Sequence, residues 1–344
     1  MNDRQSKMDR VLGDVFADAA QRKANGLPPR TPDEAFVQAA ITEANKILEP
    51  ENLTPGDKQA RYVSPDDLAP LVQDILLNGD GEHHSCGFQN MDPFYRVRRG
   101  DLAVITGIPN HGKSEWLDQV CWNLILTRNW KIAYVSLENL PSERHLIKLI
   151  EKNVNKPFYA KDEPKVSEGD IAASILQLRN NVRFLEPGDE TLTVNKILNL
   201  TVDLESRGWK PDGLVIDPWN ELDHSRSRFQ TETEHISRSL SQFRRFCQGR
   251  NIATWIIAHP TKLEKQENGF YPVPTLYDIA GSAHWRNKVD FGFTVYRHEE
   301  TVLQDGTNPV TVFISKARHK HLGQKGEAKF LYNRFTGVYR EDPQ

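Results

Sequence analysis

The feature that most constrains this chain is the segment from Gly107 to Ser114, which reads G-x-x-x-x-G-K-S. It follows an apolar β-type run at Leu102–Thr106 and precedes a stretch with helical spacing. In that context the N–H groups of a helix start cradle phosphates, and the lysine reaches the outer phosphates. The sequence therefore predicts a nucleotide-binding loop. The residues expected to contact the nucleotide are Gly107, Ile108, Pro109, Asn110, His111, Gly112, Lys113, Ser114 and Glu115.

Short apolar runs alternate with amphipathic helical stretches downstream of residue 99. The first set of runs lies at 102–106, 131–136, 182–185, 213–216 and 252–258. This alternation is typical of an α/β fold with a mostly parallel sheet flanked by helices. A second set, at 289–296, 310–315, 329–332 and 338–339, is closely spaced and predicts antiparallel strands that extend the sheet at the C-terminal end. Ile236, Leu240, Phe243 and Cys247 predict one buried helix face.

Three polar residues follow apolar runs and are candidates for the chemistry. Asp217 ends the run Gly-Leu-Val-Ile-Asp and would hold Mg²⁺ together with Ser114, partly through water. Glu138 stands just beyond the run at 131–136 and is the candidate general base. His259 follows the run at 252–258, where it would sense the γ-phosphate. The alternatives are a turn-starting Asp217, a helix-start Glu138 and a structural His259.

The 344 residues exceed the usual size of one domain, which predicts a core domain with an appendage. Residues 1–60 are polar, with two helix-compatible stretches, and predict a helical arm that either docks or is partly disordered. Residues 61–86 contain apolar positions at helical spacing and predict a linker helix. Residues 87–344 form the expected core domain.

The net charge of −3 conceals an uneven distribution. Residues 1–90 contain 9 basic and 15 acidic residues, whereas the remainder contains 35 and 32, a net charge of +3. Basic residues gather at 226–250 and at 286–329. A positive strip that contacts nucleic acid is therefore compatible with an acidic protein.

Other classes are disfavoured by the composition. No apolar run approaches the roughly 18 residues of a membrane span, so a membrane partner is not expected. Acidic residues among the first 20 disfavour a mitochondrial transit peptide and predict a cytoplasmic protein of a bacterial or phage-infected cell. The three cysteines are dispersed, which excludes a zinc ribbon. His83, His84 and Cys86 are expected to form a solvated loop, because metal sites need more ligands in geometry.

Six ordered motifs resemble a known family. They are Gly107 to Ser114, the segment 136–138, Ile216 and Asp217 with 221–224, the segment 259–262, the segment 281–283 and the segment 316–318. In order and spacing this set resembles the helicase domain of DnaB-like replicative helicases, and most closely the Twinkle-like branch. The resemblance covers about residues 87–340.

The resemblance implies a RecA-like P-loop NTPase core that uses ATP and Mg²⁺. It also implies a homo-oligomeric ring, usually a hexamer, with ATP between subunits. Such a ring moves 5′ to 3′ on single-stranded DNA and unwinds a forked duplex, and a primase or polymerase is a candidate partner. Lys316 and Arg318 resemble the pair that reaches the neighbouring subunit's ATP, with Arg318 as arginine finger. Read from composition alone, both belong to a basic surface run.

The family's central DNA-binding loop corresponds to 281–288. Its candidate DNA-binding residues are Gly281, Ser282, Ala283, His284, Arg286 and Lys288. Small residues there let backbone N–H groups approach phosphates, and the basic side chains add charge. A solvated basic turn is the alternative. The polar segment 224–233 is a candidate second pore loop.

The chain departs from the family pattern in three places. The zinc-binding and primase-like half of Twinkle-like proteins has no counterpart here, so priming is not expected. The phosphate loop is poor in glycine, and an insert at 263–274 lengthens the loop after His259.

The rival function is a DNA-binding or regulatory ATPase of the RecA or KaiC type that does not separate strands. A nucleotide kinase is a weaker rival, because it leaves Arg318 and the 281–288 loop unexplained.

Overall fold

A computed structural model describes Asn25 and residues 63–162, 164–186, 188, 191–224, 231–267, 269–279, 283–298 and 301–343. The chain divides into two compact units, Met1–Gly81 and Glu82–Gln344. Apart from Asn25, the arm expected at 1–60 lies outside the described residues. The division falls before the boundary expected after residue 86, because β1 (His83–Ser85) pairs with β2 (Arg96–Arg98) within the second unit.

The first unit contains helix α3 (Pro65–Asn78), in the part of the chain where a linker helix is expected. Its start is a capping box, because the Ser64 hydroxyl accepts from the Asp67 N–H and the Asp67 carboxylate accepts from the Ser64 N–H. The helix ends at Gly79, whose φ of 84° suits glycine. Within this helix no residue is buried.

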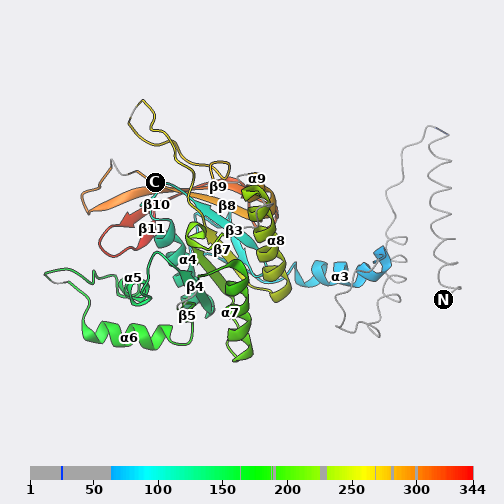
Figure 1. Ribbon diagram of the computed structural model, residues 1–344, viewed down its shortest axis with the longest axis horizontal. Coiled ribbons are helices and arrows are strands. Elements are labelled where there is room, and N and C mark those ends of the chain that lie inside the picture. The colour runs from blue at the N-terminus through cyan, green and yellow to red at the C-terminus, as the bar shows by residue number, and fades with distance from the viewer. Residues whose placement is uncertain are drawn as a thin grey trace. The chain divides into compact units, whose positions relative to one another are not determined.

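The second unit is built on a nine-stranded sheet in the order β11-β10-β9-β8-β3-β7-β6-β4-β5 (Figure 1). Strands β8, β3, β7, β6, β4 and β5 run parallel, and β9, β10 and β11 continue the sheet antiparallel beyond β8. The bounds are β3 (Leu102–Thr106), β4 (Ile132–Ser136), β5 (Val182–Phe184), β6 (Gly213–Asp217), β7 (Ala253–Ile257), β8 (Phe291–Arg297), β9 (Thr307–Ala317), β10 (Gly326–Asn333) and β11 (Tyr339–Glu341). The expected mostly parallel sheet with antiparallel strands near the C-terminus is confirmed.

Helices cover both faces of this sheet (Figure 1). Side chains alternate between faces along each strand, so β3 gives Ala103 and Ile105 to one core and Leu102 and Val104 to the other. The first core is shared with α4 (Lys113–Arg128), α5 (Glu143–Val154) and α6 (Glu168–Leu178). The second is shared with α7 (Val194–Ser206), α8 (Glu232–Arg250) and α9 (Ala283–Lys288), while the short 3-10 helix η1 (Trp219–Glu221) follows β6.

Two expectations about packing have clear outcomes. Ile236, Leu240, Phe243 and Cys247 are all buried on one face of α8, so the predicted helix face is confirmed. The solvated loop expected at His83 to Cys86 is wrong. His84 is 3% exposed and Cys86 is fully buried, because strand pairing with β2 directs this segment into the core.

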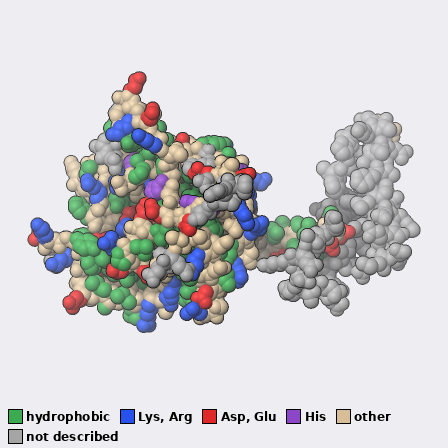
Figure 2. Space-filling model, in the orientation of Figure 1, with side chains coloured by type: hydrophobic (Ala, Val, Ile, Leu, Met, Phe, Trp, Pro, Cys, Tyr) green, Lys and Arg blue, Asp and Glu red, His purple; other side chains and the backbone are tan. Residues whose placement is uncertain are grey.

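Charged side chains are distributed over the surface of the described chain. Basic and acidic side chains are interspersed over the visible face of the described chain rather than separated into large fields (Figure 2). Among the described residues, no helix is both long enough and apolar enough to cross a membrane.

Candidate nucleotide-binding and DNA-binding sites

The predicted nucleotide-binding loop, residues 107–114, is the phosphate loop of this chain. It connects β3, the central strand of the sheet, to α4. Two of its glycines are required by geometry, since Gly107 has φ 151° and Gly112 has φ 86°. A Cβ atom on Gly107 would collide with the Val295 carbonyl oxygen, and one on Gly112 would collide with the Tyr339 hydroxyl. Asn110 takes the left-handed conformation in the middle of the loop, which asparagine tolerates. A loop poor in glycine therefore still makes the turn.

Lys113 is buried under this loop, and its hydrogen-bond partners within the described chain are carbonyl groups. It is 5% exposed, and its Nζ donates to the carbonyl oxygens of Gly107 and Ile108, each at 3.1 Å. Burial lowers the pKa of Lys113 to about 8, although the charges of Asp217 and Glu138 oppose this shift. A nearby phosphate would favour the charged form and raise this pKa again, so the lysine is suited to an anionic ligand.

Asp217 ends β6 next to Ser136, the last residue of β4. It is 3% exposed, and among the described residues its Oδ1 has no hydrogen-bond partner. Burial raises the pKa of Asp217 to about 6, and a hydrogen bond with Ser114 acts in the opposite direction. A carboxylate beside a hydroxyl fits the oxygen ligands that Mg²⁺ prefers, with water completing its shell. These two residues are the ones that would hold the ion.

Glu138 and His259 contact each other at the carboxyl ends of β4 and β7. The Glu138 Oε1 and His259 Nε2 atoms are 3.0 Å apart, and the Glu138 side chain is 46% exposed. Burial and the charge of Lys113 lower the pKa of His259, while the Glu138 carboxylate acts in the opposite direction. The Asn220 side chain of η1 accepts from the His259 N–H at 2.8 Å and holds the backbone in place. A general base and a phosphate sensor placed this way would act as one unit.

Two residues of the predicted nucleotide set have their side chains engaged elsewhere. The Glu115 carboxylate pairs with Lys152 at 2.6 Å and with Lys148 at 3.3 Å. The His111 Nδ1 accepts from the Arg297 N–H at 3.1 Å. At these two positions we therefore expect only the backbone to be available to a nucleotide.

Tyr339 of β11, near the C-terminus, is hydrogen-bonded to the phosphate loop. Its hydroxyl donates to the Gly112 carbonyl at 3.1 Å, and its N–H donates to the Gln119 side chain at 3.3 Å. Sequence reasoning missed this contact because nothing local to residue 339 indicates it. It also missed the buried pair of Asp118 and His145, 3.0 Å apart, whose charges act on Asp217 in opposite directions.

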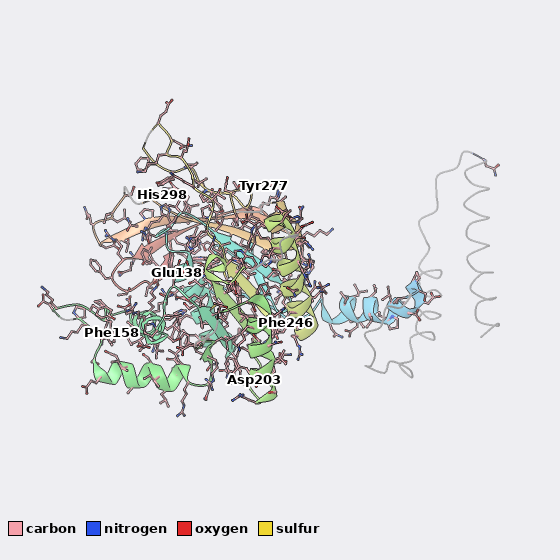
Figure 3. The ribbon with its side chains drawn as sticks, in the orientation of Figure 1. Glu138, Phe158, Asp203, Phe246, Tyr277 and His298 are labelled. Carbon is pink, nitrogen blue, oxygen red and sulfur yellow. The ribbon has the colours of Figure 1, made fainter. Side chains whose placement is uncertain are left out.

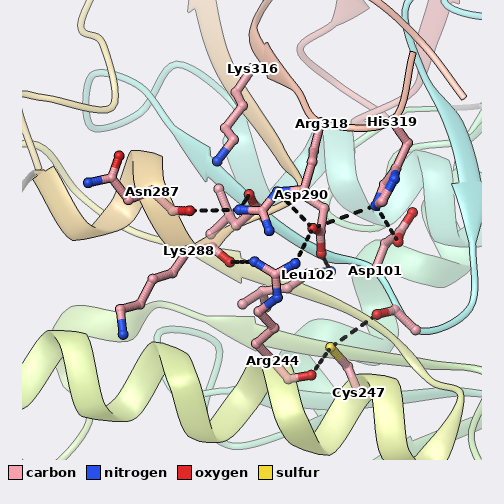
Figure 4. A network of polar contacts seen from close by, with 12 residues as sticks. Asp101, Leu102, Arg244, Cys247, Asn287, Lys288, Asp290, Lys316, Arg318 and His319 are labelled. Carbon is pink, nitrogen blue, oxygen red and sulfur yellow. Dashed lines mark hydrogen bonds and ion pairs between the residues drawn. The ribbon is translucent and has the colours of Figure 1, made fainter. Parts of the chain in front are cut away.

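Lys316 and Arg318 lie near the amino ends of β3 and β8, whereas the phosphate loop follows the carboxyl end of β3. Figure 4 shows both side chains close to Asp290 and Leu102. Arg318 Nε is 3.3 Å from Asp290, which is fully buried, and its Nη2 donates to the carbonyls of Asn287 and Val289. Asp290 also accepts from the N–H of Leu102, the first residue of β3. The phosphate loop follows the other end of β3, roughly 13 Å away at about 3.3 Å per residue. We therefore do not expect Arg318 to serve the nucleotide site of its own chain.

The predicted DNA-binding segment is partly described. Gly281 and Ser282 lie outside the described residues, as do 225–230 of the candidate second pore loop. Ala283 begins α9 and is exposed, and His284 is half-buried. Arg286 donates to the Tyr277 hydroxyl, and Lys288 donates to the Ser241 hydroxyl.

The carbonyls around the end of α9 are capped by three cations. Lys316 donates to the Arg286 carbonyl. Arg318 donates to the carbonyls of Asn287 and Val289, and Arg244 donates to that of Lys288 (Figure 4). Burial and the charge of Arg318 lower the pKa of Lys316 to about 8. Positive groups are favourable at a helix C-terminus. Within one chain, Lys316 and Arg318, the predicted finger residues, are thus hydrogen-bonded to backbone carbonyls at and just after the predicted DNA-binding segment.

Sequence comparison identifies a similar protein of known name. The chain is 38% identical over 273 residues to the Twinkle homolog protein, chloroplastic/mitochondrial, of Arabidopsis thaliana. That match covers 75% of this chain and 36% of the relative, so the chain spans about a third of the relative's length. No family model matches the sequence.

Two solved structures share the fold. One is described as an ATPase domain and superposes with a TM-score of 0.67 at 19% identity, over 82% of this chain and 100% of that one. The other is a DnaB-like replicative helicase, whose interactions with primase were studied. It superposes with a TM-score of 0.65 at 17% identity, over 98% of this chain and 75% of that one. The fold is that of RecA-like helicase ATPase domains.

Within that class, the predicted resemblance to DnaB-like replicative helicases of the Twinkle-like branch is confirmed. The name of the Arabidopsis relative places that protein in chloroplasts and mitochondria. The expectation that this chain is not mitochondrial fits poorly with that name.

Proposed function

We propose that this chain is an ATP-dependent DNA helicase, acting in replication, that works as a homo-oligomeric ring. The observation that carries the proposal is the convergence of Lys113, Ser114, Asp217, Glu138 and His259 at the carboxyl ends of neighbouring parallel strands. Ligands of open α/β sheets bind at that edge. The similarity to the Twinkle homologue supports DNA rather than a small molecule as the second substrate.

The residues divide the work of hydrolysis among them. Lys113 would neutralise the outer phosphates, and Ser114 with Asp217 would hold the metal ion. Bound Mg²⁺ supplies charge stabilisation of the transferring phosphoryl group. Glu138 would take a proton from the attacking water, with His259 holding its carboxylate in position.

The arginine finger completes the proposed site from a neighbouring subunit. Arg318 lies at the far end of β3 from its own phosphate loop, so its guanidinium serves catalysis only between chains. Its contacts with Asp290 and with two carbonyls would position it at such an interface. Movement from 5′ to 3′ and a hexameric ring are the family's pattern and form part of this proposal.

A strand-displacement assay on a forked duplex, with ATP and Mg²⁺, tests the function. The wild-type chain should release the displaced strand, and the Lys113→Ala variant should not. ATP hydrolysis and DNA binding without any strand release would instead favour the regulatory ATPase of the RecA type.

A further inference from the structure

Tyr277 is an exposed aromatic residue on a firmly held turn. The residue is 54% exposed, whereas its neighbours Leu276 and Ile279 are each only 2% exposed. Leu276 packs against Gly292 of β8, where a side chain on the glycine would collide with it. The Asp278 carboxylate accepts from both the N–H and the hydroxyl of Thr275, at 2.6 and 2.8 Å. The backbone is therefore fixed on both sides of a ring that faces solvent (Figure 3).

A guanidinium from α9 is paired with this ring. Arg286 Cζ lies 5.0 Å from the centroid of the Tyr277 ring, and its Nη1 donates to the ring hydroxyl. The Arg286 carbonyl in turn accepts from Lys316. Ring and cation thus come from two segments and are held in one arrangement before any ligand binds, which reduces the entropy lost on binding.

The insert that leads to Tyr277 repeats this combination. Tyr271 is 37% exposed with Lys265 Nζ 5.3 Å from its ring centroid, and Phe270 is 44% exposed. Exposed aromatic groups beside cations are the features that bind single-stranded nucleic acid without sequence preference. Glu264 and Glu267 also lie on the insert, and their charge opposes a phosphate backbone there. The favourable part is therefore the Tyr277 end.

We propose that Tyr277 and Arg286 form a base-stacking contact for single-stranded DNA, with the ring on a base and the guanidinium on a phosphate. This contact rests on the proposed function, because it deepens how the same DNA would be held. Phosphate contacts alone are indifferent to whether bases are present. A stacking contact makes affinity depend on the bases themselves.

Two oligonucleotides separate stacking from charge. One is oligo-dT and the other is an abasic strand of equal length and charge, both measured by fluorescence anisotropy. The full chain is used with Mg²⁺ and a non-hydrolysable ATP analogue. Stacking is worth about 1–3 kcal/mol per base, so wild type should bind oligo-dT about tenfold or more tighter than the abasic strand.

Four variants complete the test. Tyr277→Ala and Tyr277→Leu should each lose about tenfold on oligo-dT and little on the abasic strand. Tyr277→Phe keeps the ring and should retain the preference for bases. Arg286→Ala should weaken binding to both strands. Tyr277→Leu keeps an apolar side chain, so the test survives if the alanine variant folds poorly.

The outcomes distinguish this contact from the wider function. Unchanged oligo-dT affinity in both Tyr277→Ala and Tyr277→Leu overturns the stacking contact and leaves DNA binding standing. Equal losses on both strands also overturn it, because Tyr277 would then act only by holding Arg286. A wild-type chain that binds neither strand overturns the stacking contact together with the proposed helicase function.

Discussion

The two ends of strand β3 differ in the partners of their buried charged groups. At the carboxyl end, Lys113 bonds to two carbonyls and Asp217 keeps an unpartnered oxygen among the described residues. At the amino end, the buried Asp290 is surrounded by Arg244, Arg318 and the Leu102 N–H. Burying charge is costly unless it is paired and hydrogen-bonded. At the first end the Asp217 oxygen is available to a ligand, whereas at the second end both oxygens of Asp290 are paired within the chain, although the neighbouring Asp101 also has one oxygen without a partner among the described residues.

The two ends of β3 show that the role of a basic residue cannot be inferred from its charge alone. Lys113 and Lys316 both have a pKa lowered to about 8, mainly by burial. Both lysines donate to backbone carbonyls. Their neighbours differ, because the charges of Asp217 and Glu138 act on Lys113. The charge of Arg318 acts on Lys316 instead. Substitutions at the two ends of β3 should therefore have different effects on ATP binding and turnover.

Lys113→Ala should have the largest effect, because it removes the cation prepared for the β and γ phosphates. We expect nucleotide binding to be lost and ATP turnover to fall by about 1,000-fold or more. Steady-state hydrolysis and equilibrium binding of a fluorescent ATP analogue measure the two losses. Lys210→Ala, an exposed lysine elsewhere, is the matched control. Retained turnover would remove the phosphate-loop assignment.

Arg318→Ala tests whether the amino end serves only the fold. If Arg318 completes a neighbour's site, turnover should fall by roughly 1,000-fold while ATP still binds. A purely structural Arg318 would instead lower the melting temperature and leave the activity of the folded protein unchanged.

Mixing the two inactive variants sharpens that result. A Lys113→Ala subunit still carries Arg318, and an Arg318→Ala subunit still carries an intact phosphate loop. Co-assembled subunits should therefore recover part of the ATP hydrolysis, measured against each variant alone. Exchange of subunits without any recovery would contradict a finger that acts between chains.

Glu138→Gln should separate binding from chemistry at the carboxyl end. The amide keeps the size of the side chain but cannot take a proton, so hydrolysis should fall by about 100-fold or more with ATP binding retained. Single-turnover hydrolysis and nucleotide binding are the measurements. Glu168→Gln, on an exposed acid of α6, serves as control. Unchanged hydrolysis would place the base elsewhere.

The pH dependence of nucleotide binding should report Lys113. Its pKa is lowered to about 8 in the free protein, and bound phosphate would raise it again. Above pH 8 the free lysine is mostly neutral, so binding must take up a proton and affinity should fall as pH rises. Calorimetry in buffers of different ionisation enthalpy measures that uptake. Affinity that is constant from about pH 7 to about pH 9.5 would contradict this prediction.

Arg286→Ala combined with Lys288→Ala should give the smallest effect. Each phosphate contact on a single strand contributes about 0.7 to the salt slope, so the slope should decrease by up to about 1.4. Because Lys288 is bonded to Ser241, we expect Arg286 to carry most of this change. Anisotropy titrations at several salt concentrations measure it. A loss confined to some base sequences would indicate base readout instead.

Features with a local cause can be predicted from the amino-acid sequence of this chain. The phosphate loop needed glycine at two positions, and the strand before it and the helix after it follow from spacing. The buried face of α8 and the run that ends in Asp217 are also local patterns, and both were predicted. The segment at His84 was misjudged because its burial depends on pairing with β2.

Contacts between groups far apart in the sequence depend on the tertiary structure. The contact between Glu138 and His259, the brace from Tyr339 to Gly112, and the pairing of Asp290 with Arg318 join residues far apart in the chain. No periodicity records such pairs, since hydrophobic spacing reports which face of an element is buried and not what lies against it. The strand order brings these groups together. Because β9 runs antiparallel to β8, its last residues lie where β8 and β3 begin, so Arg318 and Lys113 are at opposite ends of β3. A finger at Arg318 would therefore require a second copy of this chain.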